Sequence, residues 1–207
     1  RAGDNFTYGA QRTLLSTKAL AKEYTYGDIS SFPATGTINP GDEKNKYYSK
    51  DYAILQQKQF ADWKLSVEGL VSKPGAYTLS QLQNMPGRKQ ITRHTCEEGW
   101  TAIAEWNGVQ LAGLLQTVGM LPNARFVNFF AYDGYQDCLD MTDALHPQTI
   151  LAYGMNGKPL PLQHGAPLRL RVETQIGYKS MKYLQKILIT DHFVDPGDFG
   201  WAWYTGI

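Results

Sequence analysis

The segment Arg93–Trp100, RHTCEEGW, holds the residue types best suited to chemistry. Cys96 follows an expected strand over residues 89–95, and the period-two alternation of a strand puts His94 and Cys96 on one face. Positive neighbours such as Arg93 and His94 can lower the pKa of a thiol. A thiolate serves as a nucleophile, with His94 as a candidate base, or as a soft metal ligand. A buried structural cysteine is the competing interpretation.

A second group of candidates lies between residues 156 and 182, where basic side chains are concentrated. Together they predict an anion-binding pocket. The arginines alternate with leucines along 168–173, so a strand with a solvated basic face is the alternative. The residues of this group are His164, Arg169, Arg171, Lys179 and Lys182.

Composition excludes several classes of protein. The 207 residues include 20 Lys and Arg against 19 Asp and Glu, a formal net charge of +1, which disfavours a nucleic-acid partner. An aromatic content of 13% is too high for a disordered chain. The sequence has no apolar run close to the roughly 18–20 residues that a membrane-spanning helix needs.

Short strands separated by turn residues dominate the expected elements. Asn107-Gly108 and Asn156-Gly157 each predict a type I′ hairpin. Few helices are expected, and no alternation of strand and helix is apparent, which indicates an α+β domain of mixed β-sheets with short helices. The expected strands cover 63–68, 89–95, 100–106, 109–111, 125–132, 135–141, 168–173 and 184–190, with a hairpin strand from Leu151, and the expected helices cover 11–24, 79–85 and 111–119.

The expected domain organisation has two parts. Residues 1–60 form an N-terminal helix (11–24) and an irregular arm, punctuated by Gly and Pro, that packs on the main domain. Residues 61–207 form that main domain.

Three motifs, in this order, resemble the sulfite oxidase-type family of molybdopterin-binding oxidoreductases, which includes periplasmic methionine-sulfoxide reductases. They are ITRHTCEEGWTAIAEWNGVQL, AYDGY and the long segment HPQTILAYGMNGKPLPLQHGAPLRLRVETQIGYKSMKYLQKI. The tail GWAWYTGI is also similar to the ending of family members. The resemblance implies the family's molybdopterin-binding fold and a molybdenum-molybdopterin cofactor without an appended nucleotide.

The resemblance also implies roles for particular residues. The cysteine of the R-x-x-C-x-E-x-W pattern, Cys96, would be the metal ligand, which suits the preference of molybdenum for a soft anionic sulfur. Thr37, in the segment Thr35–Asn39, is the candidate for an N-terminal contact. The other expected cofactor contacts are His94, Ala131, His164, Arg169, Ser180, Met181 and Lys182.

The implied activity is two-electron redox chemistry, with oxygen-atom transfer on a small substrate such as a sulfoxide. Cys96, Asp133 and Tyr178 are the catalytic candidates, although the last two also fit as structural polar residues. Sulfite oxidases carry a basic residue soon after the ligand cysteine, whereas this chain has Glu97, Glu98 and Gly99, which argues against sulfite. The alternatives are a non-catalytic binding module that retains the fold without metal, sulfite oxidation, and an enzyme with Cys96 as nucleophile and His94 as base.

Cys138 is expected to be a buried structural thiol, because a disulfide with Cys96 would prevent metal ligation. No haem or flavin motif is present, so a redox partner is expected, either a membrane haem protein or a soluble cytochrome. The resemblance further implies a periplasmic monomer, exported folded with a cleaved twin-arginine signal, that takes a small-molecule substrate and no nucleic acid.

Overall fold

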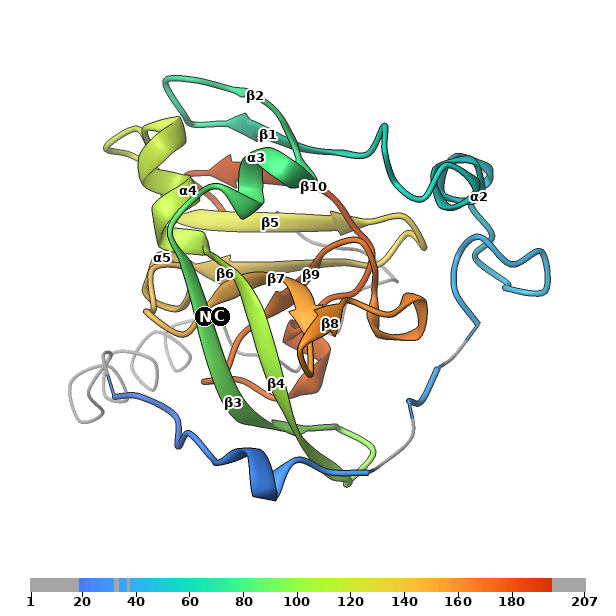
Figure 1. Cartoon of the computed structure of the whole chain (residues 1–207). Coiled ribbons are helices and arrows are strands. Elements are labelled where there is room, and N and C mark those ends of the chain that lie inside the picture. Colours follow the sequence, from blue (N-terminus) through green and yellow to red (C-terminus); the bar gives the residue numbers. More distant parts are fainter. Residues whose placement is uncertain (1–18, 32–33, 37, 195–207) are drawn as a thin grey trace.

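The computed structural model describes residues 19–31, 34–36 and 38–194, which build two five-stranded sheets (Figure 1). The first sheet has the order β2-β1-β10-β5-β6, and β1 and β10 run parallel whereas the other neighbours are antiparallel. Its strands are β1 (Lys64–Gly69), β2 (Gly75–Thr78), β5 (Phe126–Ala131), β6 (Gln136–Asp140) and β10 (Leu184–Thr190).

The second sheet is antiparallel, with the order β3-β4-β7-β8 and with β9 paired to β7. Its long β3–β4 hairpin fills the lower half of the view in Figure 1. Its strands are β3 (Gly87–Thr95), β4 (Thr101–Gln110), β7 (Ile150–Met155), β8 (Lys158–Pro159) and β9 (Arg169–Arg171).

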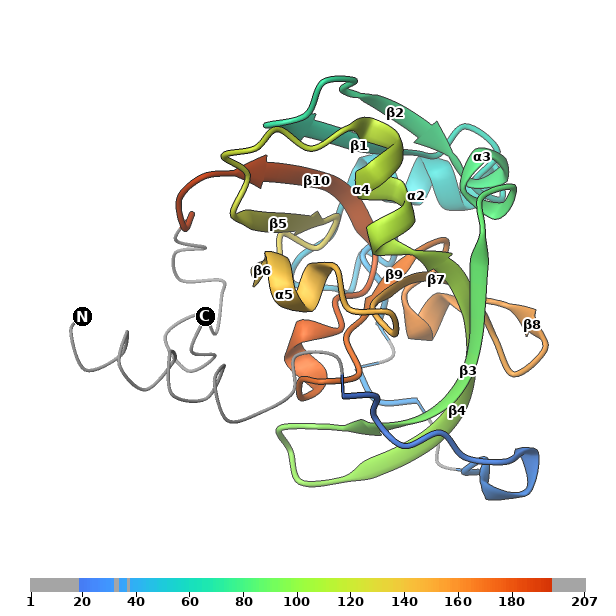
Figure 2. The same cartoon turned by 90° about the vertical axis from the view of Figure 1, so that its left-hand side faces the viewer.

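The helices are short and connect the strands. The described α-helices are α2 (Lys50–Gln57), α3 (Leu79–Gln83), α4 (Leu111–Val118) and α5 (Met141–Ala144), with the 3-10 turns η1 (Tyr26–Asp28), η2 (Leu162–His164) and η3 (Gly177–Lys179). α4 leads from β4 of the second sheet to β5 of the first (Figure 2) and ends at Gly119, in the left-handed conformation that favours glycine at a helix end. None of the described helices has the length and apolar character needed to span a membrane.

One hydrophobic core joins the first sheet, α4 and the inner residues of β9. Leu65 and Val67 alternate inward along β1, as the sequence pattern predicts, and both are fully buried. Leu114 and Val118 of α4 pack in the same cluster. The expected α+β class, with mixed sheets and few short helices, is confirmed.

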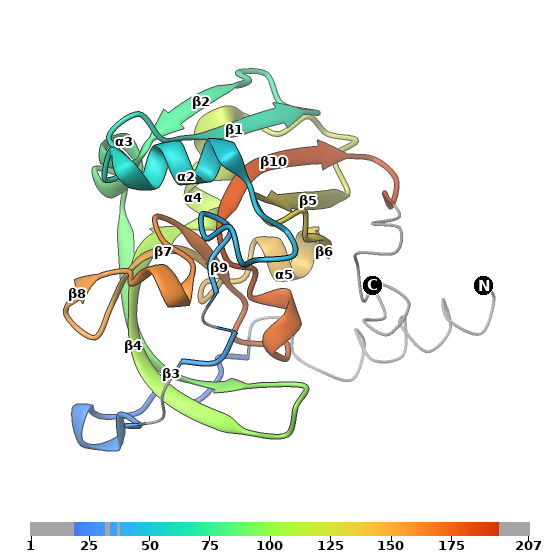
Figure 3. The same ribbon diagram turned by 90° about the vertical axis from the view of Figure 1, so that its right-hand side faces the viewer.

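Residues before the first sheet are more regular than expected. α2 lies on the outside of the molecule (Figure 3) within the stretch that the sequence indicated to be irregular. Only Tyr52 of this polar helix is buried, so the helix has no apolar stripe to reveal it. The Tyr52 hydroxyl donates to the Ala166 carbonyl at 2.6 Å and fixes the helix to the core.

The predicted helix over 11–24 is wrong where it can be judged. Residues 1–18 lie outside the described part, and residues 19–24 are extended. Glu23 forms a β-bridge with Thr92 of β3, and the Ser30 amide donates to the Ile103 carbonyl of β4. Residues 19–31 therefore lie along the β3–β4 hairpin (Figure 1). The expected boundary near residue 60 stays a prediction.

The prediction of a hairpin at Asn107-Gly108 is also wrong. The prediction of a hairpin at Asn156-Gly157 is confirmed by the antiparallel pairing of β7 with β8. β4 continues straight through Asn107 and Gly108, and its register against β7 shifts between them. A Cβ on Gly108 would lie 2.3 Å from the Leu151 carbonyl oxygen, so the glycine permits close approach of two strands and not a turn.

Gly108→Ala should lower the free energy of unfolding by about 3 kcal/mol, because the added methyl group meets backbone that cannot move aside. Urea unfolding measures the change. Gly113→Ala, in α4 where an added Cβ meets no atom within 4 Å, is the matched control and should raise stability by about 0.5–1 kcal/mol. A neutral Gly108→Ala would contradict the close approach of β4 and β7.

Candidate functional site

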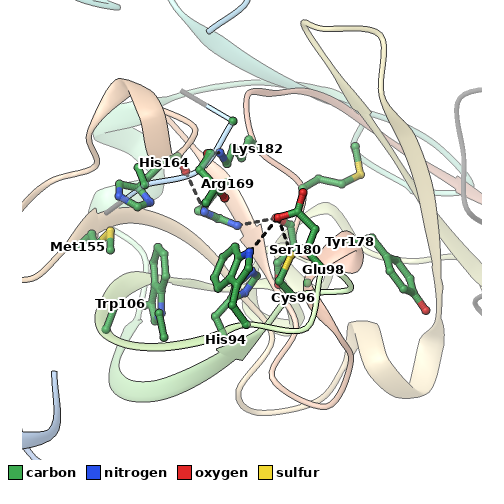
Figure 4. A pocket seen from close by; sticks show the side chains of 18 of the residues that line it. His94, Cys96, Glu98, Trp106, Met155, His164, Arg169, Tyr178, Ser180 and Lys182 are labelled. Atoms are coloured by element: carbon green, nitrogen blue, oxygen red, sulfur yellow. Dashed lines mark hydrogen bonds between the residues drawn. The ribbon is translucent and has the colours of Figure 1, made fainter. Parts of the chain in front are cut away.

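A cavity of about 440 Å³ opens between the turn at the tip of the β3–β4 hairpin, the segment that follows β9, and residues 34–36 (Figure 4). It gathers most of the predicted site residues from distant parts of the sequence. Those lining it are His94, Cys96, Asp133, His164, Arg169, Tyr178, Ser180, Met181 and Lys182.

Cys96 occupies the first position of the hairpin turn. Its amide donates to the Trp100 carbonyl at 2.9 Å, and Gly99 turns the chain with a φ of 90°. The thiol sulfur lies 3.5 Å from Glu97 Oε2 and 3.9 Å from Glu98 Oε2. Burial and these carboxylates raise the pKa of the Cys96 thiol, so the lowered pKa expected from its basic neighbours is wrong.

Arg169 lies at the cavity wall and is only 4% exposed, so the solvated-face alternative is wrong. Its guanidinium donates to the carbonyls of His164 at 3.0 Å and Ser180 at 2.7 Å, while the buried Nε has no partner among the residues that the structure describes. Burial, and then the charge of Arg171, lowers the pKa of Arg169 to about 9.

Lys182, which lies between η3 and β10, lines the same cavity. Its ammonium donates to the carbonyls of Thr35 at 3.2 Å and Gln163 at 2.8 Å. Burial, followed by the charge of Arg169, lowers the pKa of Lys182 to about 8. The same two causes lower the pKa of His164 to about 4.

The hydrogen bonds of Arg169 and Lys182 indicate an anion site. Among the described residues, neither Arg169 nor Lys182 donates to a carboxylate, and both use backbone carbonyls instead. A buried cation without a counter-ion is costly unless a ligand supplies one. A thiol, the buried Arg169 with its unpartnered Nε–H and the half-buried Lys182 therefore fit an anionic, sulfur-binding metal cofactor.

Arg171 points elsewhere, although the sequence grouped it with the pocket. It is 1% exposed and pairs with Glu173, with a 2.8 Å contact between Arg171 Nη2 and Glu173 Oε2. Its Nη1 contacts His94 Nδ1 at 2.5 Å, and its guanidinium lies 4.4 Å from the ring centre of Trp106. Burial and then the charge of Arg171 lower the pKa of His94 to about 2.

Lys179 is likewise buried away from the cavity. Its ammonium donates to Asp137 Oδ1 at 2.8 Å and to the Cys138 carbonyl at 2.7 Å. This pair fixes η3 to β6, and η3 carries Tyr178 at the cavity wall. Cys138 is free and buried, and burial raises its pKa to about 12, in agreement with a structural thiol.

Of the predicted cofactor contacts, Ala131 lies outside the cavity and Thr37 cannot be placed. Ala131 is buried in β5 and does not line the cavity, and its amide donates to the Tyr135 carbonyl. Thr37 lies outside the described residues. The sequence analysis missed Trp106 and Met155, which line the cavity from β4 and β7. Only the pairing of these strands brings them there, so no local motif could reveal them.

The fold and this site define a domain for an anionic redox cofactor. Residues 52–196 match the model of the oxidoreductase molybdopterin-binding domain. The chain therefore belongs to this family of molybdopterin-binding oxidoreductases, and molybdenum-molybdopterin is its cofactor. The described residues contain no cluster of three or more His, Cys, Asp or Glu side chains suited to a metal ion.

Named relatives share the matched region. The chain is 40% identical over 166 residues to a chain of Azospira oryzae provisionally named protein-methionine-sulfoxide reductase subunit YedZ1, covering 78% of this chain and 62% of that one. It is 32% identical over 165 residues to the protein-methionine-sulfoxide reductase catalytic subunit MsrP of Xanthomonas campestris, covering 69% and 51%.

The sulfane dehydrogenase SoxCD of Paracoccus pantotrophus has a similar fold, with a TM-score of 0.60 and 24% identity over 63% of this chain and 39% of that one. At this identity the likeness supports the fold alone. The chain spans about half to three fifths of the length of the two named relatives above.

The stability of the cofactor-free protein should rise with pH above about 8, because the pKa of Lys182 is about 8 in the folded chain against an ordinary 10.5. Between these values the unfolded chain binds more protons, so raising the pH favours folding. Urea midpoints should therefore rise from pH 7.5 to 9.5 in the wild type relative to Lys182→Met. Lys158→Met, at an exposed site, should follow the wild type. If the urea midpoints of the wild type and both variants changed with pH in parallel, the pKa of Lys182 would not be lowered in the folded chain.

Proposed function

We propose that this chain is the cofactor-bearing part of a molybdenum oxidoreductase that reduces sulfoxides, with Cys96 as the protein ligand of the metal. The observation that carries the proposal is that one cavity holds a thiol, the buried Arg169 and the half-buried Lys182, and that neither cation has a carboxylate partner among the described residues. The reaction consumes two electrons and two protons and converts a sulfoxide to a thioether and water.

Each residue group has a part in this activity. Arg169 and Lys182 bind the anionic cofactor, and the Ser180–Met181 segment between them lines the same cavity. When bound, the cofactor supplies two-electron redox chemistry and oxygen-atom transfer. Asp133, whose pKa is raised by burial, and Tyr178 lie at the cavity wall and are the candidates to bind substrate or hold a proton.

The carboxylates beside Cys96 favour a neutral substrate. Glu97 and Glu98 both line the cavity and are exposed within the hairpin turn. Two negative charges at this position repel an anion such as sulfite but leave a neutral sulfoxide unaffected. The names of the methionine-sulfoxide reductase relatives support the same choice.

The electrons come from a separate redox partner, for which a membrane haem protein is our first choice and a soluble cytochrome the second. The periplasm is the proposed location, with export of the folded chain. Both proposals rest on the resemblance to periplasmic family members.

Cys96→Ser should lose molybdenum, because a hydroxyl is a poor substitute for a soft thiolate. We expect a loss at least as large as the roughly 10–100-fold that changes around a metal site cause. Elemental analysis after expression in a molybdopterin-competent host measures it. Cys138→Ala is the matched control and should retain the metal, since Cys138 lies buried outside the cavity.

The loaded protein is then assayed with an artificial electron donor and sulfoxides, and with an acceptor and sulfite. Turnover of sulfoxides that exceeds turnover of sulfite is expected. A wild-type protein without molybdenum, or one that oxidises sulfite and leaves sulfoxides intact, would reject the proposal.

A further inference from the structure

The buried pair Arg171–Glu173 lies behind the cavity and has no part in the function proposed so far. Both oxygens of Glu173 accept from Arg171, with 3.2 Å from Nε to Oε1 and 2.8 Å from Nη2 to Oε2. The side chains are 1% and 0% exposed. A bidentate pair of this kind holds the guanidinium plane in one orientation.

Further contacts hold the pair from two directions. Gln90 of β3 donates its side-chain amide to Glu173 Oε1 at 3.0 Å and to the Gln148 carbonyl at 3.0 Å. The ring of Trp106 lies under the guanidinium of Arg171, 4.4 Å from centre to centre. The orientation of Arg171 is therefore set by strands β3 and β4 as well as by Glu173.

The third guanidinium nitrogen of Arg171, Nη1, determines which ring nitrogen of His94 carries the proton. Arg171 Nη1 lies 2.5 Å from His94 Nδ1. A guanidinium is always a donor and has no lone pair to offer, so Nδ1 must be the acceptor. The imidazole proton is then on Nε2, and the ring is neutral.

His94 Nε2 lies beside Gly177, and both residues line the cavity. The ring lines the cavity, and Nε2 has no hydrogen-bond partner within the part of the chain that the structure describes. A Cβ on Gly177 would come within 2.8 Å of Nε2, so a larger residue at the start of η3 would displace the His94 ring. Figure 4 shows His94 among the side chains around the cavity, with Arg169 and Cys96.

We propose that Arg171 and Glu173 are positioning residues that fix His94 as a neutral Nε2–H donor to an acceptor atom of the bound molybdopterin. This inference rests on the function proposed above and deepens it. Arg169, Lys182 and His164 already surround the cavity with basic groups. A neutral donor adds a hydrogen bond there without adding a further positive charge.

The tautomer is measured first, by 15N–1H correlation spectra of the cofactor-free, histidine-labelled chain. The His94 signals, assigned by their loss in His94→Gln, should report an unprotonated Nδ1 and a protonated Nε2. His146 is an internal control, since its Nδ1 accepts from the Gln148 amide at 3.2 Å and its Nε2 contacts the Ala19 carbonyl at 3.2 Å. A proton on His94 Nδ1 would overturn the proposal.

The double variant Arg171→Met/Glu173→Leu then tests the positioning role. Replacing both members of a buried ion pair by apolar residues preserves folding better than removing one charge. We expect the His94 spectrum to change to a mixture of tautomers while the His146 signals stay in place. Unchanged His94 signals would show that the pair does not fix the ring.

The contact with the cofactor is tested by retention of pterin, measured as fluorescence of the released and oxidised pterin, and of molybdenum. His94→Phe removes the donor and should lower retention on the order of tenfold, whereas His94→Gln keeps an N–H near the position of Nε2 and should retain most of it. Equal retention in both variants would reject the donor role. A wild-type protein without cofactor would instead reject the proposed function, and the spectra of the cofactor-free chain separate the two failures.

Discussion

Buried positive charge without a protein counter-ion is the constraint on which this structure depends. Arg169 is buried and Lys182 is half-buried, yet within the described residues their N–H groups donate only to backbone carbonyls. Such groups stay charged only at a cost in free energy, which is why their pKa values fall to about 9 and about 8. An anionic cofactor supplies the missing charge, so stability of the chain and occupancy of its cavity are linked.

The rest of the fold holds this arrangement in place. Arg169 of β9 lines the cavity together with Ser180 and Lys182 of the segment between β9 and β10, and the buried Lys179–Asp137 pair fixes that segment to β6. The β3–β4 hairpin, which belongs to the same sheet as β9, brings Cys96 to the cavity. In the described part of the chain, the buried carboxylates of Asp137 and Glu173 pair with Lys179 and Arg171, and not with the cations that face the cavity.

Local patterns in the sequence predicted most strands, because alternation and turn residues act within a few positions. They failed where distant pairing decides. Asn107-Gly108 has the composition of a turn, but its pairing with both β3 and β7 keeps it extended. A solvated face remained an alternative for the arginines of β9, since alternation separates two faces of a strand but does not say whether both are covered. The family motifs located the thiol and the basic residues, whereas Trp106 enters the cavity only through sheet packing.

The parallel pairing of β1 with β10 has a consequence for the order of events during synthesis. β10 lies at the centre of the first sheet, between β1 and β5, although it is the last strand described. During synthesis β1 and β5 leave the ribosome before β10, which begins more than fifty residues after the end of β5. The two earlier strands can join one sheet only after β10 is available. Contacts of such long range form slowly. The cavity segment immediately precedes β10, so the cofactor-binding side is completed only when nearly the whole domain has been translated.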